Sequence, residues 1–210
     1  MPSTSSLWAN DDADAWRAVL GEYPKRVREL VPEVGDDDDW MWTALSEEAN
    51  ARQPPHLSMA DLQRLMSWKL RRGKFRPQLL ALIRRNREDD VVKATSDAFA
   101  AKTVSDAFDS LVTLKGVGPA TASAILAAYH SDGRVPFMAD EAMEAIPDLG
   151  VKYTISHYRA YEKRMKERCD RINAGSTSGS TLSCNDLAKC LWVEGMQARA
   201  ACRGRKRRRE

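Results

Sequence analysis

The chain has 210 residues, 43% of them hydrophobic, so it is long and apolar enough to bury the core of one ordinary domain. No stretch approaches the apolar length of a membrane span, and the first ten residues lack the features of a secretory signal, so we expect neither kind of segment. The net charge of +3 is unevenly distributed, because residues 1–40 hold ten acids and four bases whereas residues 64–87 hold nine bases and no acid. A basic cluster of this kind is typical of proteins that neutralise nucleic-acid phosphates.

Apolar residues recur at helical spacing along almost the whole chain, and no alternating strand pattern or internal repeat is found. The sequence therefore predicts an all-α helical bundle. We expect a disordered N-terminus 1–12, a helical domain 13–173, a flexible linker 174–182, a C-terminal helix 183–201 that packs on the domain, and a basic tail 202–210. Helices are predicted over 13–30 and 40–51, after Ser58, from Pro77, and over 89–101, 104–113, 120–129, 141–146 and 154–173.

Four consecutive aspartates, residues 36–39, precede the second predicted helix. A calcium loop needs ligands at alternating positions, so this run does not predict a calcium site. We expect a solvated or interaction tract, and the acidic N-terminal segment is the candidate contact for a protein partner.

Residues 68–77 place five cations and two aromatic residues around a predicted helix end and turn. Cations neutralise phosphates, and an aromatic side chain among them can stack on an unpaired base. The alternative is that Trp68 belongs to the core and that the cations form a solvated face. The candidate DNA-binding residues of this segment are Trp68, Lys69, Arg71, Arg72, Lys74 and Arg76.

A Gly-hydrophobic-Gly turn, residues 116–118, lies between two apolar helical segments. Glycine allows backbone angles barred to other residues, and Pro119 suits the first position of a helix. The free amides of that helix start can bind an anion, typically a nucleic-acid phosphate. The candidate DNA-binding residues here are Lys115, Gly116, Val117, Gly118, Ala120 and Thr121.

This run resembles the helix-hairpin-helix motif, and residues 57–146 are similar to the helix-hairpin-helix DNA glycosylase superfamily. Residues 68–77 also resemble an uncharacterised eukaryotic group with the pattern Trp-Lys-x-x-Arg-Gly-x-x-Arg-Pro. The resemblance implies a DNA-glycosylase-like fold, a duplex DNA partner and a role in DNA repair. Members that also cut the strand carry a lysine where this chain has Ala120, so the resemblance implies at most a monofunctional glycosylase without lyase activity. Lys115 stands where the family usually has proline.

The resemblance also implies a catalytic role for Asp140, which follows the second hairpin helix and a short Pro-containing segment. Its carboxylate would stabilise the positive charge that develops on the sugar, or activate water, after the base leaves the stack. The alternative is that Asp140 only caps a helix beginning at Glu141. Two functions stay open, a monofunctional glycosylase and a noncatalytic module that serves chromatin or repair assemblies through DNA or protein contacts.

We expect no cofactor and no metal. The cysteines at 169, 184, 190 and 202 are too loosely spaced for an iron–sulfur cluster, and the three histidines lack ligand partners at suitable spacing. The basic run 203–209 resembles a nuclear localisation signal, although it could equally be a nucleic-acid arm. We expect a nuclear protein, or otherwise a cytoplasmic one.

Overall fold

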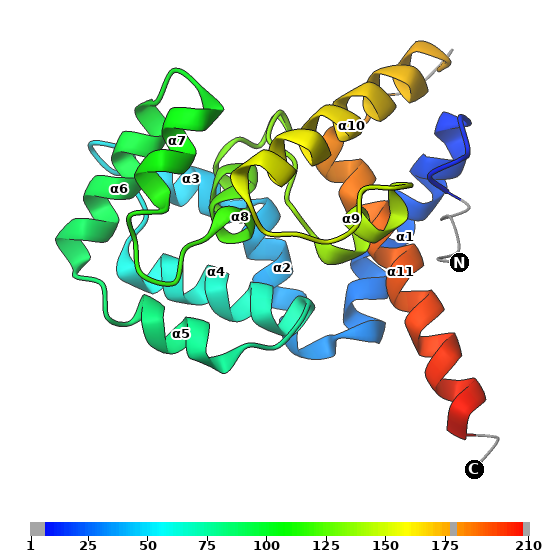
Figure 1. Ribbon diagram of the computed structural model, residues 1–210, viewed down its shortest axis with the longest axis horizontal. Coiled ribbons are helices and arrows are strands. Elements are labelled where there is room, and N and C mark those ends of the chain that lie inside the picture. Colours follow the sequence, from blue (N-terminus) through cyan, green and yellow to red (C-terminus); the bar gives the residue numbers. More distant parts are fainter. Residues whose placement is uncertain (1–6, 177–179, 208–210) are drawn as a thin grey trace.

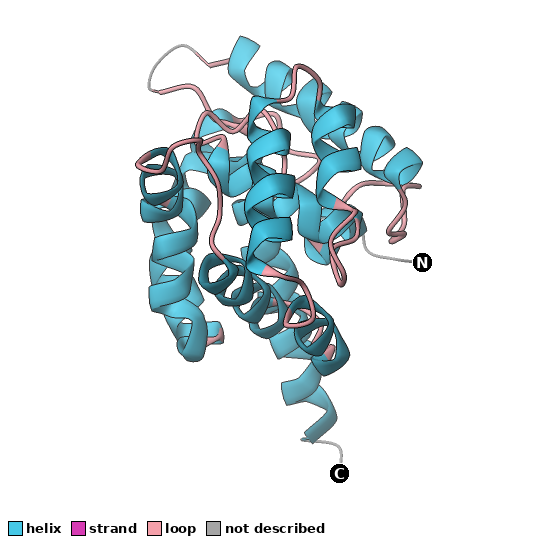
Figure 2. Cartoon of the chain, turned by 90° about the vertical axis from the view of Figure 1, so that its left-hand side faces the viewer, coloured by secondary structure: helices cyan, strands magenta, loops and turns pink. Residues whose placement is uncertain are grey.

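The computed structural model describes residues 7–176 and 180–207, and within these ranges the chain is helical with no strand (Figures 1 and 2). This confirms the predicted all-α class. The helices are α1 (Ala13–Leu30), the 3₁₀ turn η1 (Pro32–Val34), α2 (Gly35–Trp42), α3 (Ala44–Asn50), α4 (Met59–Arg72), α5 (Pro77–Ile83), α6 (Glu88–Ala100), α7 (Val104–Leu111), α8 (Pro119–Tyr129), α9 (Asp140–Ala145), α10 (Ile155–Ala174) and α11 (Cys184–Arg207). None of the described helices has the length and apolar character of a membrane span.

Helix α8 forms the centre of the bundle and is surrounded by α3, α4, α7 and α10 (Figure 1). Residues 120–128 are all buried, so this helix is apolar around its whole circumference rather than along one stripe. Burial on every side holds the start of α8 in place. That start is where the resemblance expects contact with DNA.

The aspartates 36–39 lie inside α2 rather than before a helix, and the predicted helix 40–51 is split into α2 and α3. Three of them occupy the first turn of α2, where the positive end of the helix dipole favours carboxylates. Asp38 is buried and accepts hydrogen bonds from Tyr23 Oη at 3.0 Å and Trp68 Nε1 at 2.8 Å. The Nε of Arg72 lies 3.5 Å from the same oxygen.

The neighbouring carboxylates are also used within the chain. Asp37 pairs with Arg64 and Arg71, and Asp39 pairs with Arg28. The expectation of a solvated tract is therefore wrong for buried Asp38, whereas Asp36 and Asp39 are exposed as expected. This acidic run gives no support to a protein partner.

Replacing Asp38 with alanine should destabilise the protein by about 3–5 kcal/mol, because it leaves the buried Arg72 guanidinium without its carboxylate. Asp36→Ala is the matched control, because Asp36 is exposed and makes no ion pair within the described chain. The control should lose at most about 1 kcal/mol of helix-dipole stabilisation. Urea unfolding of both variants measures the difference, and equal losses would contradict the internal role of Asp38.

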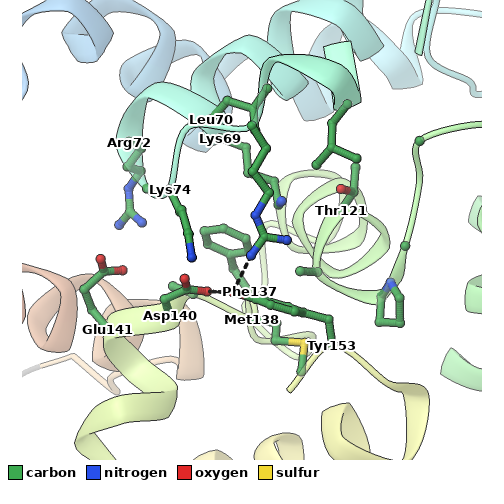
Figure 3. Close-up of a pocket in the computed structure, with 18 residues that line it drawn as sticks. Lys69, Leu70, Arg72, Lys74, Thr121, Phe137, Met138, Asp140, Glu141 and Tyr153 are labelled. Atoms are coloured by element: carbon green, nitrogen blue, oxygen red, sulfur yellow. Dashed lines mark hydrogen bonds between the residues drawn. The ribbon is translucent and has the colours of Figure 1, made fainter. Parts of the chain in front are cut away.

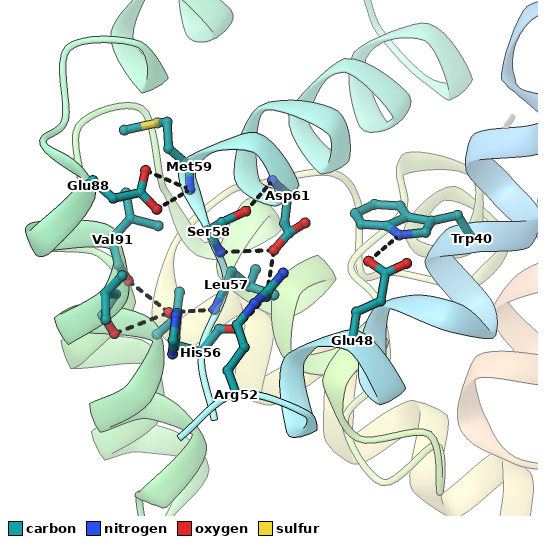
Figure 4. A network of polar contacts seen from close by, with 12 residues as sticks. Trp40, Glu48, Arg52, His56, Leu57, Ser58, Met59, Asp61, Glu88 and Val91 are labelled. Atoms are coloured by element: carbon teal, nitrogen blue, oxygen red, sulfur yellow. Dashed lines mark hydrogen bonds and ion pairs between the residues drawn. The ribbon is translucent and has the colours of Figure 1, made fainter. Parts of the chain in front are cut away.

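A capping box starts α4 as predicted. Ser58 Oγ accepts from the Asp61 amide at 3.2 Å, and the Asp61 carboxylate accepts from the Ser58 amide at 2.8 Å. Arg52 pairs with Asp61 at 2.7 Å, and Glu88 at the start of α6 accepts from the Met59 amide (Figure 4). This network fixes the direction of α4, whose far end carries the basic segment.

The termini of the domain differ from the expected boundaries. Residues 1–6 lie outside the described ranges, but residues 7–12, expected to be disordered, pack on the bundle through buried Leu7 and an ion pair between Asp11 and Arg168. Residues 177–179 of the predicted linker also lie outside these ranges. Asn173 binds both the amide and the carbonyl of Leu182, at 3.0 and 2.9 Å, so the linker's end is tied down.

The C-terminal helix packs against α1 and continues to Arg207, six residues past its predicted end at 201, so most of the basic tail is helical backbone. Both views show its last turns extending beyond the bundle (Figures 1 and 2). Residues 208–210 of the predicted tail lie outside the described ranges.

Candidate functional site

A cavity of about 200 Å³ lies between the end of α4, the start of α8 and the start of α9. It brings together three segments that are far apart in the sequence (Figure 3). Its lining residues are Lys69, Leu70, Arg72, Gly73, Lys74, Arg76, Leu79, Gly116, Gly118, Pro119, Ala120, Thr121, Phe137, Met138, Ala139, Asp140, Glu141 and Tyr153. The basic segment, the 116–118 turn and Asp140, each singled out from the sequence, therefore share one site.

Only one of the two turn glycines needs to be glycine for the backbone. Gly116 has φ of +81°, and a Cβ there would lie 3.1 Å from the Leu79 carbonyl oxygen and 3.2 Å from the Ile83 nitrogen. Gly118 has φ of −106° and ψ of −176°, an extended conformation open to any residue, and a Cβ there would meet nothing within 4 Å. Gly118 is therefore not required for its backbone conformation, and a larger side chain there would project into open space.

Unpaired amides are present at this turn, as expected. Within the described chain, the N–H groups of Gly116, Gly118 and Ala120 have no hydrogen-bond acceptor, and Gly118 is the N-cap of α8 without a side-chain cap. Pro119 follows at the first helical position. This arrangement can hold an anion through main-chain nitrogens and the helix dipole.

The side chains of the turn divide into two groups. Val117, Ala120 and Thr121 are buried, so their side chains serve packing, and any contact with an anion uses the backbone. Lys115 is exposed, and its backbone is held by a residue that the sequence did not single out. Asn86 accepts from the Lys115 amide at 2.8 Å and donates to its carbonyl at 3.0 Å, which ties the turn to the segment between α5 and α6.

Three residues of the basic segment are structural. Trp68 is fully buried and donates to Asp38, so the expected stacking on a base is wrong and the core alternative is correct. Arg72 lines the cavity wall, but its guanidinium is buried beside Asp38. Arg71 pairs with Asp37 and with the Glu33 carbonyl, which commits its guanidinium to η1 and α2.

The other three cations lie at the cavity. Figure 3 shows Lys69 and Lys74 pointing from the α4 side toward Phe137, Asp140 and Tyr153 on the opposite side. Arg76 places its guanidinium carbon 5.0 Å from the centre of the Tyr153 ring. These cations give the cavity a positive edge.

Asp140 does not cap a helix. Helix α9 begins at Asp140 itself, Ala139 is the N-cap, and no side chain caps this end. The Asp140 carboxylate instead accepts a 2.7 Å hydrogen bond from Tyr153 Oη, which in turn accepts from Arg76 at 3.4 Å (Figure 3). Burial and this bond to Asp140 raise the pKa of Tyr153 to about 12, so the hydroxyl stays a donor at neutral pH.

Lys69 has an unusual environment for a lysine. It is partly buried at the cavity, and its ammonium group makes no hydrogen bond or ion pair with any described residue. Burial lowers its pKa to about 8, Asp140 opposes this change, and Arg76 adds to it. At pH 7 about a tenth of the Lys69 side chains therefore carry a neutral amine, far more than for a lysine in water.

Glu141 links the cavity to the C-terminal helix. Its buried carboxylate pairs with Arg199 of α11, which also binds Glu144 at 2.7 Å. The two helices touch closely, because a Cβ on Gly195 would lie 3.0 Å from the Glu141 Cβ. These contacts fix α9, and with it Asp140, against α11.

Replacing Arg199 with alanine should destabilise the protein by about 1–3 kcal/mol at pH 7, because it leaves the buried Glu141 without its cation. Burial already raises the pKa of Glu141, with Arg199 and Arg72 opposing that shift. An ionised group with a raised pKa weakens the fold as pH rises through that pKa, so the loss should be smaller at pH 5 than at pH 7.

Urea unfolding of Arg199→Ala at both pH values tests this expectation. In a Glu141→Gln background the same replacement should lose nearly equal stability at the two pH values. If Arg199→Ala loses the same stability at both pH values in the protein that keeps Glu141, the role given to this carboxylate is contradicted.

Comparison of the chain with protein-family models, with curated proteins and with solved structures gives no match. Membership of the helix-hairpin-helix glycosylase superfamily therefore stays a prediction.

Proposed function

We propose that this protein binds duplex DNA and receives one unstacked nucleoside in the cavity, where Asp140 assists cleavage of the glycosidic bond. In this proposal α7, the 112–118 turn and α8 act as a helix-hairpin-helix, and the bundle is DNA-glycosylase-like. The basic run 203–209 and the DNA partner suggest a nuclear setting in DNA repair.

One observation carries the proposal, namely that unpaired amides, cations and a carboxylate surround the same cavity. Phosphates bind amides at helix starts and cations, whereas a developing sugar cation needs a nearby carboxylate. A nucleoside in DNA presents both charges within a few ångströms of one another. At about 200 Å³ the cavity is smaller than the roughly 300–1,000 Å³ typical of drug-sized ligands, which suits a single base.

The arrangement around Asp140 favours catalysis over capping. Its carboxylate has no helix amide to satisfy and is oriented by the Tyr153 hydroxyl. Phe137 and Tyr153 give the cavity aromatic walls against which a base can stack. A carboxylate held in a partly dry site stabilises positive charge more strongly than one in water.

Phe75 supports contact with unstacked DNA. Its side chain is 68% exposed, in the loop between two cations of the cavity edge, Lys74 and Arg76. An exposed aromatic residue flanked by cations can fill the gap that an extruded base leaves in the stack.

Binding to an undamaged duplex over a series of salt concentrations tests the proposal directly. We expect log K to fall linearly with log salt, by roughly 0.9 for each phosphate neutralised. Absence of measurable binding at low salt would overturn the proposed function. Binding that does not depend on salt would remove the cations and the turn from it.

A further inference from the structure

We propose that Lys69 is an amine nucleophile that forms an imine with the aldehyde of an abasic deoxyribose held in the cavity. This inference rests on the proposed function, because it requires a DNA sugar to enter the cavity. It assigns a covalent step to a residue of α4, outside the turn and outside α8.

Partial burial without an ionic partner separates Lys69 from the other cations of the basic segment. It lines the same cavity as Asp140, and no carboxylate or carbonyl in the described chain holds its ammonium. Arg71 and Arg72, on the same turn of α4, are both committed to aspartates of α2. Lys74 and Arg76 line the same cavity but are exposed, whereas Lys69 is partly buried.

The surroundings raise the share of neutral amine, which is the nucleophilic form. Burial is the main cause of its low pKa of about 8. The charged groups that share the cavity are Asp140 and Glu141 on α9, Arg72 on α4, and Lys74 and Arg76 in the following loop. Asp140 opposes the effect of burial, whereas Arg76 reinforces it.

Space for the reaction exists on the α8 side. Ala120 lines the same cavity with a side chain of one methyl group, so the amine faces no long side chain from that position. The expectation of a glycosylase without lyase activity depended on position 120 alone. Lys69 reaches the cavity from a different helix.

The step balances without an oxidant or a metal. The amine lone pair forms a bond to C1′, and the carbonyl π electrons move to oxygen, which takes a proton to give a carbinolamine. The hydroxyl then leaves as water as the C=N bond forms. One amine and one aldehyde give one imine and one water.

Reductive trapping tests this step. The full chain is incubated with a duplex that carries a single abasic site, in the presence of sodium cyanoborohydride, which reduces an imine to a stable secondary amine. We expect a covalent protein–DNA adduct that maps to Lys69, with a trapping rate that rises with a midpoint near pH 8. Lys69→Arg should lower trapping at least tenfold while its unfolding midpoint stays close to that of the unaltered protein.

Lys163→Arg on α10 is the control, because Lys163 is exposed, lies outside the cavity lining and pairs with Glu167, so this variant should trap normally. Undiminished trapping by Lys69→Arg, or an adduct at another lysine, would overturn the inference. A duplex with a tetrahydrofuran site, which has no aldehyde, reports binding alone. If the protein binds this duplex but is not trapped on the abasic one, the inference fails and the proposed function stands, whereas failure to bind either duplex removes both.

Discussion

Replacing Gly118 with aspartate should lower duplex DNA affinity at least about tenfold, or by about 1.4 kcal/mol, without unfolding the protein. The new side chain meets open space and the backbone there is extended, so the fold can accept it. Its carboxylate would stand beside the unpaired Gly118 and Ala120 amides, where we propose that a phosphate binds. Like charges brought together at a binding surface oppose association. Fluorescence anisotropy with a labelled duplex measures the loss, and urea unfolding checks the fold.

Two further glycine variants make the test specific. Gly118→Ala adds volume at the same point without charge, so it should keep both the fold and DNA binding. Gly116→Ala should instead destabilise the turn, because its φ of +81° and the contact at 3.1 Å with the Leu79 carbonyl leave no room for a Cβ. If Gly118→Asp binds as tightly as the unaltered protein, the amides at this turn do not contact DNA.

The helix positions were accessible from the sequence wherever the signal is local. The capping box at Ser58 and Asp61 and the proline at 119 act within one turn of helix, and α4 and α8 begin where these residues indicate. The burial of α8 on every side was harder to predict from the sequence, because a helix that is apolar all round shows no apolar stripe.

The functions of the charged residues could not be separated by sequence alone. Arg71 and Arg72 resemble Lys69 and Lys74 in the sequence, and only the fold brings aspartates of α2 against the first pair. Pairing across more than 30 residues depends on how α2 crosses α4. The contact between Tyr153 and Asp140 could not be predicted from the sequence either, because Tyr153 lies in an irregular segment with no recognisable pattern.

Whether Asp140 caps a helix depends on which residue begins α9, and the predicted and observed starts differ by one residue. A helix starting at Glu141 would have made Asp140 the N-cap, with its carboxylate bound to helix amides. The helix starts at Asp140, so the carboxylate is available to the cavity. Boundaries of this accuracy lie beyond sequence patterns.

Asp140→Asn should lower base excision about 10²–10³-fold, or about 2.7–4 kcal/mol in the activation free energy, while duplex affinity stays nearly unchanged. The amide keeps the size of the side chain and can still accept from Tyr153, but it no longer carries the charge that stabilises a sugar cation. The assay uses duplexes with single damaged or mispaired bases and counts alkali-labile sites. Tyr153→Phe is the matched control, because it keeps the Asp140 charge while it removes the 2.7 Å hydrogen bond that orients the carboxylate and the longer bond from Arg76, so it should cause a smaller loss. Excision that survives in Asp140→Asn would contradict the assignment of this acid, and DNA binding without excision of any base would favour a noncatalytic DNA-binding module.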